Sequence, residues 1–352
     1  MSQPVATSTP LYLQRGFSLL LTIAVGVVLF AVYFGQLSRT AAADSETISP
    51  ESATSREPAQ NAANDVARNS RSVAWGDVDG DGDLDLAVGN GQDFDKSPRG
   101  NRANYILRYE NGRLIERIDI PRNNRRDTRS VAWGDWDGDG DLDLAVGNYG
   151  DRNQVYKNEN GSLVPAWESV ERFDTTSVAW GDVDGDGDLD LAVGNYGNRN
   201  QVYENENGTL LLDNQYGWES SDQLRTTSIA WGDWDNDGDL DLAVGNDTDL
   251  NQVFENVSGV LQLDLDNEWG WQSPDTKATY AIAWGDWNNS GYLDLAVGNN
   301  GEANQIFENQ QHRSNPISPL SPAIEFDDIL QVFSRRFSHR TTSLAWGDWD
   351  ND

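Results

Sequence analysis

An acidic loop that recurs along the chain has residue types and a spacing suited to binding a hard divalent cation. The first copy reads DVDGDGDLD from Asp77 to Asp85, with aspartate at every odd position and glycine at the sixth. Ca²⁺ takes about six to eight oxygen ligands, and alternating carboxylates in a tight turn can supply several of them. Glycine at the sixth position permits that turn. The spacing predicts side-chain ligands at positions one, three, five and nine, and a backbone carbonyl ligand at position seven.

Four copies of the loop are intact, a fifth is altered and a sixth is incomplete. The expected metal-binding residues are Asp77, Asp79, Asp81, Asp83 and Asp85; Asp135, Asp137, Asp139, Asp141 and Asp143; Asp182, Asp184, Asp186, Asp188 and Asp190; Asp233, Asp235, Asp237, Asp239 and Asp241; and Asp286, Asn288, Ser290, Tyr292 and Asp294. The fifth loop has lost two ligand carboxylates, and the sixth reaches only Asp348, Asp350 and Asp352. We therefore expect about four strong Ca²⁺ sites, one weakened site and one truncated site.

Other roles for these carboxylates fit the pattern less well. The twelfth position of the first loop is Val88 rather than a bidentate acid, and no helical pattern follows, which argues against an EF-hand. The number of carboxylates favours Ca²⁺ over Mg²⁺, which usually keeps several waters. Carboxylates that remain ionised as metal ligands cannot act as general acids. We therefore expect the ions to be structural rather than catalytic.

The acidic loops belong to a longer repeat that indicates the fold class. Strings close to SVAWGDVDGDGDLDLAVGN begin at residues 72, 130, 177, 228, 281 and 343, and a block close to NQVYENENG follows each of the first five. Val73 and Trp75 alternate with Ser72 and Ala74, the period-two pattern of a strand. About four short strands in a repeat of roughly 50 residues is typical of a β-propeller blade. We expect an all-β propeller of four-stranded blades, with five full repeats, a truncated sixth, and the Val and Trp positions packed between blades.

Three segments precede the repeats, which occupy residues 72–352. Residues 1–16 form a short tail, residues 17–35 carry an apolar run from Phe17 to Phe34, and residues 36–71 have the polar composition of a flexible linker. The run is long enough to cross a bilayer as a helix. It is expected to be an uncleaved signal anchor or, alternatively, a signal peptide cleaved after Ala43. The repeats are therefore expected to face outside the cytoplasm, at the cell surface or in the periplasm, or to be secreted.

The composition narrows the class of function. The chain has 25 Lys and Arg against 58 Asp and Glu, for a net charge of −33, which argues against nucleic-acid binding. It has no Cys, which excludes disulfide scaffolds and Cys-based zinc sites. It contains no nucleophile elbow, zinc-protease, P-loop or Rossmann motif. No catalytic residue is therefore assigned, although an enzyme remains an open alternative.

At the acidic loops and the Trp75-Gly76 pair, the repeats resemble the FG-GAP/VCBS family, which includes the integrin α-subunit propellers. The family pattern D-x-D-x-D-G-x-x-D maps onto Asp77 to Asp85 and its next three counterparts, while Gly89-Asn90 replaces the family's Gly-Ala-Pro, as in its bacterial branch. The resemblance covers residues 72–352. It implies a propeller with Ca²⁺ between the first two strands of each blade, in a surface or secreted protein used for adhesion or ligand binding.

The resemblance leaves the ligand open. An extracellular protein or glycan is expected, and a carbohydrate-active propeller, either a lectin or a lyase- or hydrolase-like enzyme, is the alternative. The Trp residues that recur at the same positions of each repeat are expected to pack between blades. The alternative is that some of them stack on sugar rings. The irregular insertions at 93–102 and 310–340, together with Trp269, are the expected ligand-facing loops. Because the sixth repeat stops inside its loop, we expect a truncated product or a fragment.

Overall fold

The structure is a computed structural model that describes residues 69–91, 103–121, 126–213, 217–263, 265, 270–310, 320–325 and 341–345. These residues form twenty β-strands and no helix. In this part of the chain there is accordingly no helix with the length and apolar character needed to cross a membrane. The predictions for residues 1–16, 17–35 and most of 36–71 fall outside the described residues. So do Trp269, most of the two insertions, and Asp348, Asp350 and Asp352.

The first two repeats each form a four-stranded antiparallel sheet in which strands pair in chain order. Blade 1 consists of β1 (Ser70–Gly76), β2 (Asp85–Asn90), β3 (Tyr105–Glu110) and β4 (Arg113–Asp119). Blade 2 consists of β5 (Asp127–Gly134), β6 (Asp143–Tyr149), β7 (Gln154–Asn158) and β8 (Leu163–Glu168). Each acidic loop therefore joins the first strand of a blade to the second.

Blades 3 to 5 repeat this plan with two changes. Blade 3 has β9 (Thr175–Gly181), β10 (Asp190–Asn195) and β11 (Gln201–Asn205), and its outer strand is divided into β12 (Leu210–Leu211) and β13 (Trp218–Glu219), which both pair with β11. Blade 4 has β14 (Thr226–Gly232), a long β15 (Asp241–Asn256) and β16 (Leu261–Gln262). The strand β17 (Trp271–Gly285) passes from the outer edge of blade 4 into the inner strand of blade 5, which continues with β18 (Asp294–Asn299), β19 (Gln305–Asn309) and β20 (Leu320–Glu325).

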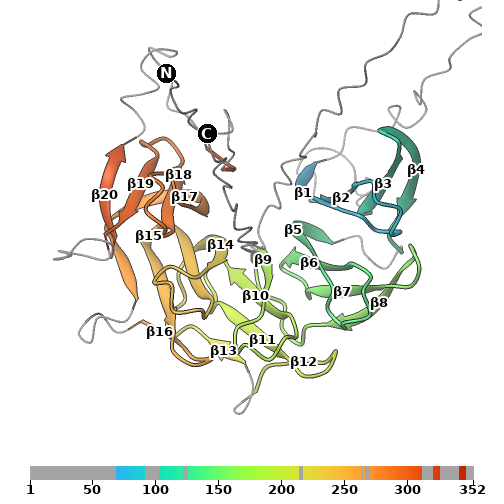
Figure 1. Cartoon of the computed structure of the whole chain (residues 1–352), viewed down its shortest axis with the longest axis horizontal. Helices are drawn as coiled ribbons and strands as arrows, with labels where there is room; N and C mark the ends of the chain where they lie inside the picture. Colours follow the sequence, from blue (N-terminus) through green and yellow to red (C-terminus); the bar gives the residue numbers. More distant parts are fainter. Residues whose placement is uncertain are drawn as a thin grey trace, which may run out of the picture.

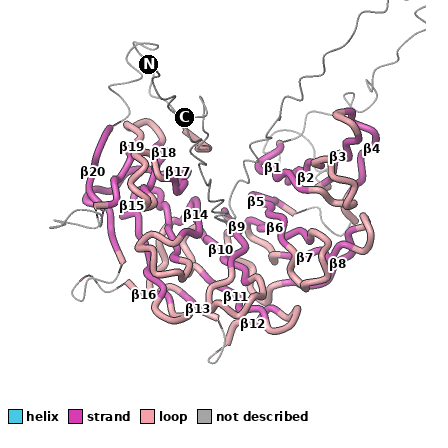
Figure 2. Tube along the Cα trace, viewed as in Figure 1, coloured by secondary structure: helices cyan, strands magenta, loops and turns pink. Residues whose placement is uncertain are grey.

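The blades fan out around a common centre (Figure 1). The inner strand of each blade contacts that of the next, from β1 and β5 through β9 and β14 to β17. These strands surround a central cavity of about 580 Å³, which the start of the sixth repeat, residues 342–345, also lines. Strands and short connections alternate along the whole fan (Figure 2). This radial arrangement of antiparallel sheets is that of a β-propeller, and it confirms the predicted all-β class.

The repeated Val, Trp and Gly residues form the contact between neighbouring blades. A Cβ atom added to Gly134 would lie 2.6 Å from Cδ1 of Trp180 in the next blade, so only glycine allows this close approach. The Trp180 indole N–H also donates to the Ala132 carbonyl, 3.2 Å away. Trp133, Trp231 and Trp284 make equivalent contacts with their preceding blades. The predicted packing between blades is confirmed for these four Trp residues, whereas Trp75 of blade 1 is 44% exposed.

A second Trp series packs in the same way near the outer strands. Trp167 meets Tyr203 of the next blade edge-on, with ring centroids 4.9 Å apart. Trp218 with Phe254, and Trp271 with Phe307, repeat this contact at 4.9 Å. Because these indoles are used between blades, stacking on sugars is not needed to explain their periodicity.

Candidate metal centres

The first aspartate of each acidic loop organises the turn that follows it. The Asp77 carboxylate accepts the N–H groups of Gly80, Asp81 and Gly82 at 2.8, 3.1 and 2.9 Å. Gly80 and Gly82 have φ values of 73° and 92°, a conformation that glycine adopts readily. Asp182 accepts the corresponding three N–H groups of its own loop. The sequence therefore folds the loop back over its first carboxylate.

The ninth aspartate is the first residue of the second strand and is buried. The Asp190 carboxylate accepts the N–H of Val183 at 2.7 Å and the N–H of Asn205 on the third strand at 2.7 Å. Asp85, Asp143, Asp241 and Asp294 accept equivalent pairs of N–H groups. This carboxylate therefore ties the loop to the sheet even before any ion is considered.

Burial of these carboxylates changes their proton affinity. Desolvation raises the pKa of Asp143 to about 6, of Asp190 to about 7 and of Asp241 to about 8, although two backbone N–H donors oppose the rise in each case. Nearby loop carboxylates add to it, such as Asp235 and Asp237 beside Asp241. A cation placed among these carboxylates would favour the ionised form of each and lower its pKa.

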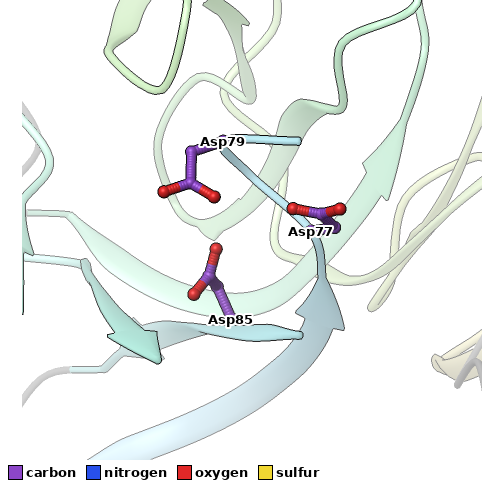
Figure 3. A group of neighbouring side chains, drawn as sticks. All are labelled: Asp77, Asp79 and Asp85. Carbon is purple, nitrogen blue, oxygen red and sulfur yellow. The ribbon is translucent and has the colours of Figure 1, made fainter. Parts of the chain in front are cut away.

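The first, third and ninth carboxylates converge in four loops. Their oxygen atoms lie within 4.8 Å of one another in the groups Asp77, Asp79 and Asp85; Asp135, Asp137 and Asp143; Asp182, Asp184 and Asp190; and Asp233, Asp235 and Asp241. In the first group the three side chains point toward a shared space (Figure 3). The sequence predicted these twelve residues as ligands, and the fold brings them together.

The donor set fits Ca²⁺. Each residue of the converging groups offers a carboxylate oxygen, the ligand type that hard cations prefer. The Oδ1 atoms of Asp79, Asp135 and Asp137 are buried and have no hydrogen-bond partner. Buried acceptors without a partner are costly, and an ion bound among them would satisfy them. Residues at positions one, three and nine would therefore hold the ion.

Comparison with known families identifies these repeats. A model described as an FG-GAP-like repeat matches residues 97–146, 135–193 and 182–244, and one described as an FG-GAP repeat matches residues 69–106. Together the matches run from residue 69 to residue 244, half of the chain. The chain belongs to the FG-GAP repeat family.

Two solved structures are similar to this FG-GAP protein at 13% sequence identity. A crystal structure of BBS1N in complex with ARL6DN, soaked with mercury, has a TM-score of 0.45 and covers 80% of this chain and 85% of that chain. The same complex soaked with lead has a TM-score of 0.41, with 74% and 83% covered. No curated protein matches the sequence.

The fifth and seventh positions of the FG-GAP loops lie outside the converging groups. The Asp81 carboxylate accepts the N–H of Asp83 at 2.9 Å, and Asp139, Asp186 and Asp237 accept the corresponding N–H of Asp141, Asp188 and Asp239. The side chains of Asp83 and Asp188 accept N–H groups from the turns at Asn111 and Asn207. These residues support the turn in the structure, and their predicted ligand roles remain predictions.

The fifth FG-GAP loop keeps the same backbone with fewer charges. The Asp286 carboxylate accepts the N–H groups of Ser290 and Gly291 at 2.9 and 2.7 Å, and Asp294 is buried. The Asn288 amide donates to Glu308 on the third strand, 3.2 Å away, and Tyr292 occupies the seventh position. The turn therefore survives the loss of two of the four predicted ligand carboxylates and of the aspartate at the seventh position.

Sequence reasoning missed the side chains that join one FG-GAP loop to the next. The Asn205 amide donates to the carbonyl of Trp136 in the preceding blade's loop, 2.8 Å away, while its own N–H donates to Asp190. Asn158, Asn256 and Asn309 repeat this pair of contacts. A continuous chain of hydrogen bonds thus connects all five described acidic loops. The one sequence signal for this contact is the asparagine that recurs at the sixth position of the repeated NQVYENENG block.

Proposed function

We propose that the chain is a Ca²⁺-stabilised propeller that acts as a ligand-binding or adhesion module outside the cytoplasm. The observation that carries the metal assignment is the fourfold convergence of three carboxylates at the junction between strands. Residues 17–35 would hold the module at the membrane, or cleavage after Ala43 would release it. The expected ligand is an extracellular protein or glycan.

The stabilising effect of Ca²⁺ follows from where the loops lie. A Cβ added to Gly161 of blade 2 would be 3.3 Å from Cβ of Asp79 in blade 1, and Gly208 and Gly259 lie equally close to Asp137 and Asp184. The loops of blades 1, 2 and 3 therefore each touch the next blade. An ion that fixes a loop also fixes this contact, and one site filled at 100 times its dissociation constant adds about 2.7 kcal/mol of stability.

Thermal unfolding in Ca²⁺ and in EDTA tests the proposal. We expect millimolar Ca²⁺ to raise the unfolding midpoint strongly and EDTA to remove the gain, with a smaller effect of Mg²⁺. Asp184→Asn should reduce the Ca²⁺-dependent gain while changing the midpoint in EDTA little, because Asn retains the oxygen that accepts the N–H of Asp186. The matched control is Glu302→Gln in the exposed turn between β18 and β19. An identical midpoint in Ca²⁺ and EDTA would contradict the metal assignment.

Binding assays test the second half of the proposal. A glycan array and a panel of extracellular proteins, each run in Ca²⁺ and in EDTA, separate a lectin from a protein-binding module. The carbohydrate-active enzyme alternative instead predicts new reducing ends or unsaturated uronates when polysaccharides are incubated with the chain. Accessibility of the repeats to protease added outside intact cells tests the location. Protection of the repeats until the cells are lysed would contradict an extracytoplasmic module.

A further inference from the structure

A position on the third strand of every blade lies beside the acidic loop and changes its charge along the chain. The residues at this position are Arg108, Lys157, Glu204, Glu255 and Glu308, from β3, β7, β11, β15 and β19. They are cationic in the first two blades and anionic in the last three. The loops themselves carry the same aspartates at positions one, three, five and nine in blades 1 to 4.

In blades 1 and 2 the third-strand cation is paired with the loop carboxylates. The Arg108 guanidinium forms an ion pair with Asp79. The Lys157 ammonium forms an ion pair with Asp137 and lies 3.0 Å from Asp139. Asp79 and Asp137 belong to the converging groups, so each cation occupies part of the negative field that an ion would use.

In blades 3 and 4 a fixed carboxylate replaces this cation. The Glu204 carboxylate accepts the N–H of Gly217 at 2.9 Å, and the Glu255 carboxylate accepts the N–H of Gly270 at 3.0 Å. The Glu204 carboxylate lies close enough to Asp184 for their negative charges to repel each other. Glu255 stands in the same relation to Asp235. The two glutamates therefore add negative charge at the third loop position.

Blade 5 combines a weakened loop with the third-strand carboxylate. The Glu308 carboxylate accepts the amide of Asn288, which stands at the third loop position. Counted over the four loop positions and the third-strand residue, the side-chain charge is −3 in blades 1, 2 and 5 and −5 in blades 3 and 4. Blades 3 and 4 are thus the most negative of the five.

We propose that this third-strand residue sets two classes of Ca²⁺ site, tight sites in blades 3 and 4 and weaker sites in blades 1, 2 and 5. The inference rests on the proposed Ca²⁺ binding and goes beyond it. In blades 1 and 2 an incoming ion must displace or coexist with the paired cation, which weakens binding. In blades 3 and 4 the extra carboxylate strengthens it.

Exchange of the third-strand residues tests the proposal. Blades 2 and 4 are a matched pair, because both loops read DWD at their start and differ at the fourth position and in Lys157 against Glu255. Calorimetric titration of CaCl₂ into the metal-free full chain, purified in mild detergent, should count two tight equivalents. Lys157→Glu should raise this to three, with about a tenfold fall in the dissociation constant of the converted site. Glu255→Lys should lower it to one.

These exchanges are compatible with folding, because the neighbouring blades already carry both residue types at this strand position. Lys157→Gln, which removes the positive charge alone, should give an intermediate affinity. Arg172→Glu and Glu302→Lys make the same changes in total charge on connections that do not join the first and second strands, and should leave the count at two. Thermal unfolding in EDTA checks that each variant is folded.

The outcomes separate the two proposals. Absence of Ca²⁺ uptake by every version would overturn the proposed function itself. Uptake by the wild-type chain at equal sites that neither exchange alters would leave the Ca²⁺ sites standing and overturn the assignment of two classes. A gain in Arg172→Glu equal to that in Lys157→Glu would show an effect of total charge alone, and would also overturn it.

Discussion

Trp75 in blade 1 and Trp180 in blade 3 occupy the same position in their repeats but have opposite surroundings. Trp180 is 0% exposed and Trp75 is 44% exposed, and the Val residues two positions earlier, Val178 and Val73, are 5% and 55% exposed. Trp180 lies over Gly134 of the preceding blade, whereas no described blade precedes blade 1. The residue type is constant, so the difference in burial comes from the neighbouring blade.

The third strands show the same contrast. Blades 2 to 5 carry an Asn that donates to the loop of the preceding blade, but blade 1 has Tyr109 there. The Tyr109 ring contacts Trp75, with centroids 5.8 Å apart. In blade 1 two aromatic side chains therefore contact each other at the place where blades 2 to 5 form a hydrogen bond to the preceding blade. Stability in such a repeat array resides largely in the contacts between units.

Truncation of the two tryptophans should give the largest difference between the blades. We expect Trp180→Ala to lower the free energy of unfolding by about 3–5 kcal/mol, because it empties a fully buried contact between blades. Trp75→Ala should cost about 1 kcal/mol or less. Urea unfolding in excess Ca²⁺ measures both. Equal losses would show that the exposed face of blade 1 is covered in solution.

Removal of the bridging asparagine should have the next largest effect. Asn205→Ala leaves the buried carbonyl of Trp136 and the partly buried carbonyl of Leu189 without their amide donor and should cost about 1–3 kcal/mol. Tyr109→Asn, at the same position in blade 1, should change stability by about 1 kcal/mol or less. The same urea unfolding experiment compares them. A neutral Asn205→Ala would mean that the bond between loops contributes nothing to the contact between blades.

The parts of the structure that the sequence predicted are those encoded within one short stretch. Asp77, Asp79 and Asp85 span nine residues, so their spacing alone indicates that they meet. The strand pattern of each repeat is equally local. The fifth position lies outside the converging groups, where Asp81 accepts the N–H of Asp83, and its predicted ligand role stays a prediction. The alternation of aspartates along the loop predicts on which side of the turn a side chain lies, but it does not predict which N–H group that side chain accepts.

The parts that the sequence did not reveal depend on contacts between distant segments. Lys157 lies 20 residues beyond Asp137 in the sequence and meets it only because β7 pairs with β6. Asn158 and Val78 are 80 residues apart and belong to different blades. The periodic pattern within one repeat does not show which of its residues contacts which residue of the next repeat. The merging of outer and inner strands in β17 likewise depends on the geometry of two blades.

The smallest expected difference involves a hydroxyl at the contact between inner strands. Thr227 Oγ1 lies 3.0 Å from the Gly245 carbonyl in its own blade and 2.7 Å from the Thr279 carbonyl in the next, so it donates at this contact. Thr227→Val should cost about 1 kcal/mol, because it removes that donor without changing the side-chain volume much. Arg71 occupies the same position in blade 1 and is exposed, so Arg71→Ala should stay within about 0.5 kcal/mol of the wild type. Blades 1 and 4 are both followed by another blade, so a loss at Arg71 as large as that at Thr227 would show that the cost comes from this strand position and not from the hydroxyl that donates to the next blade.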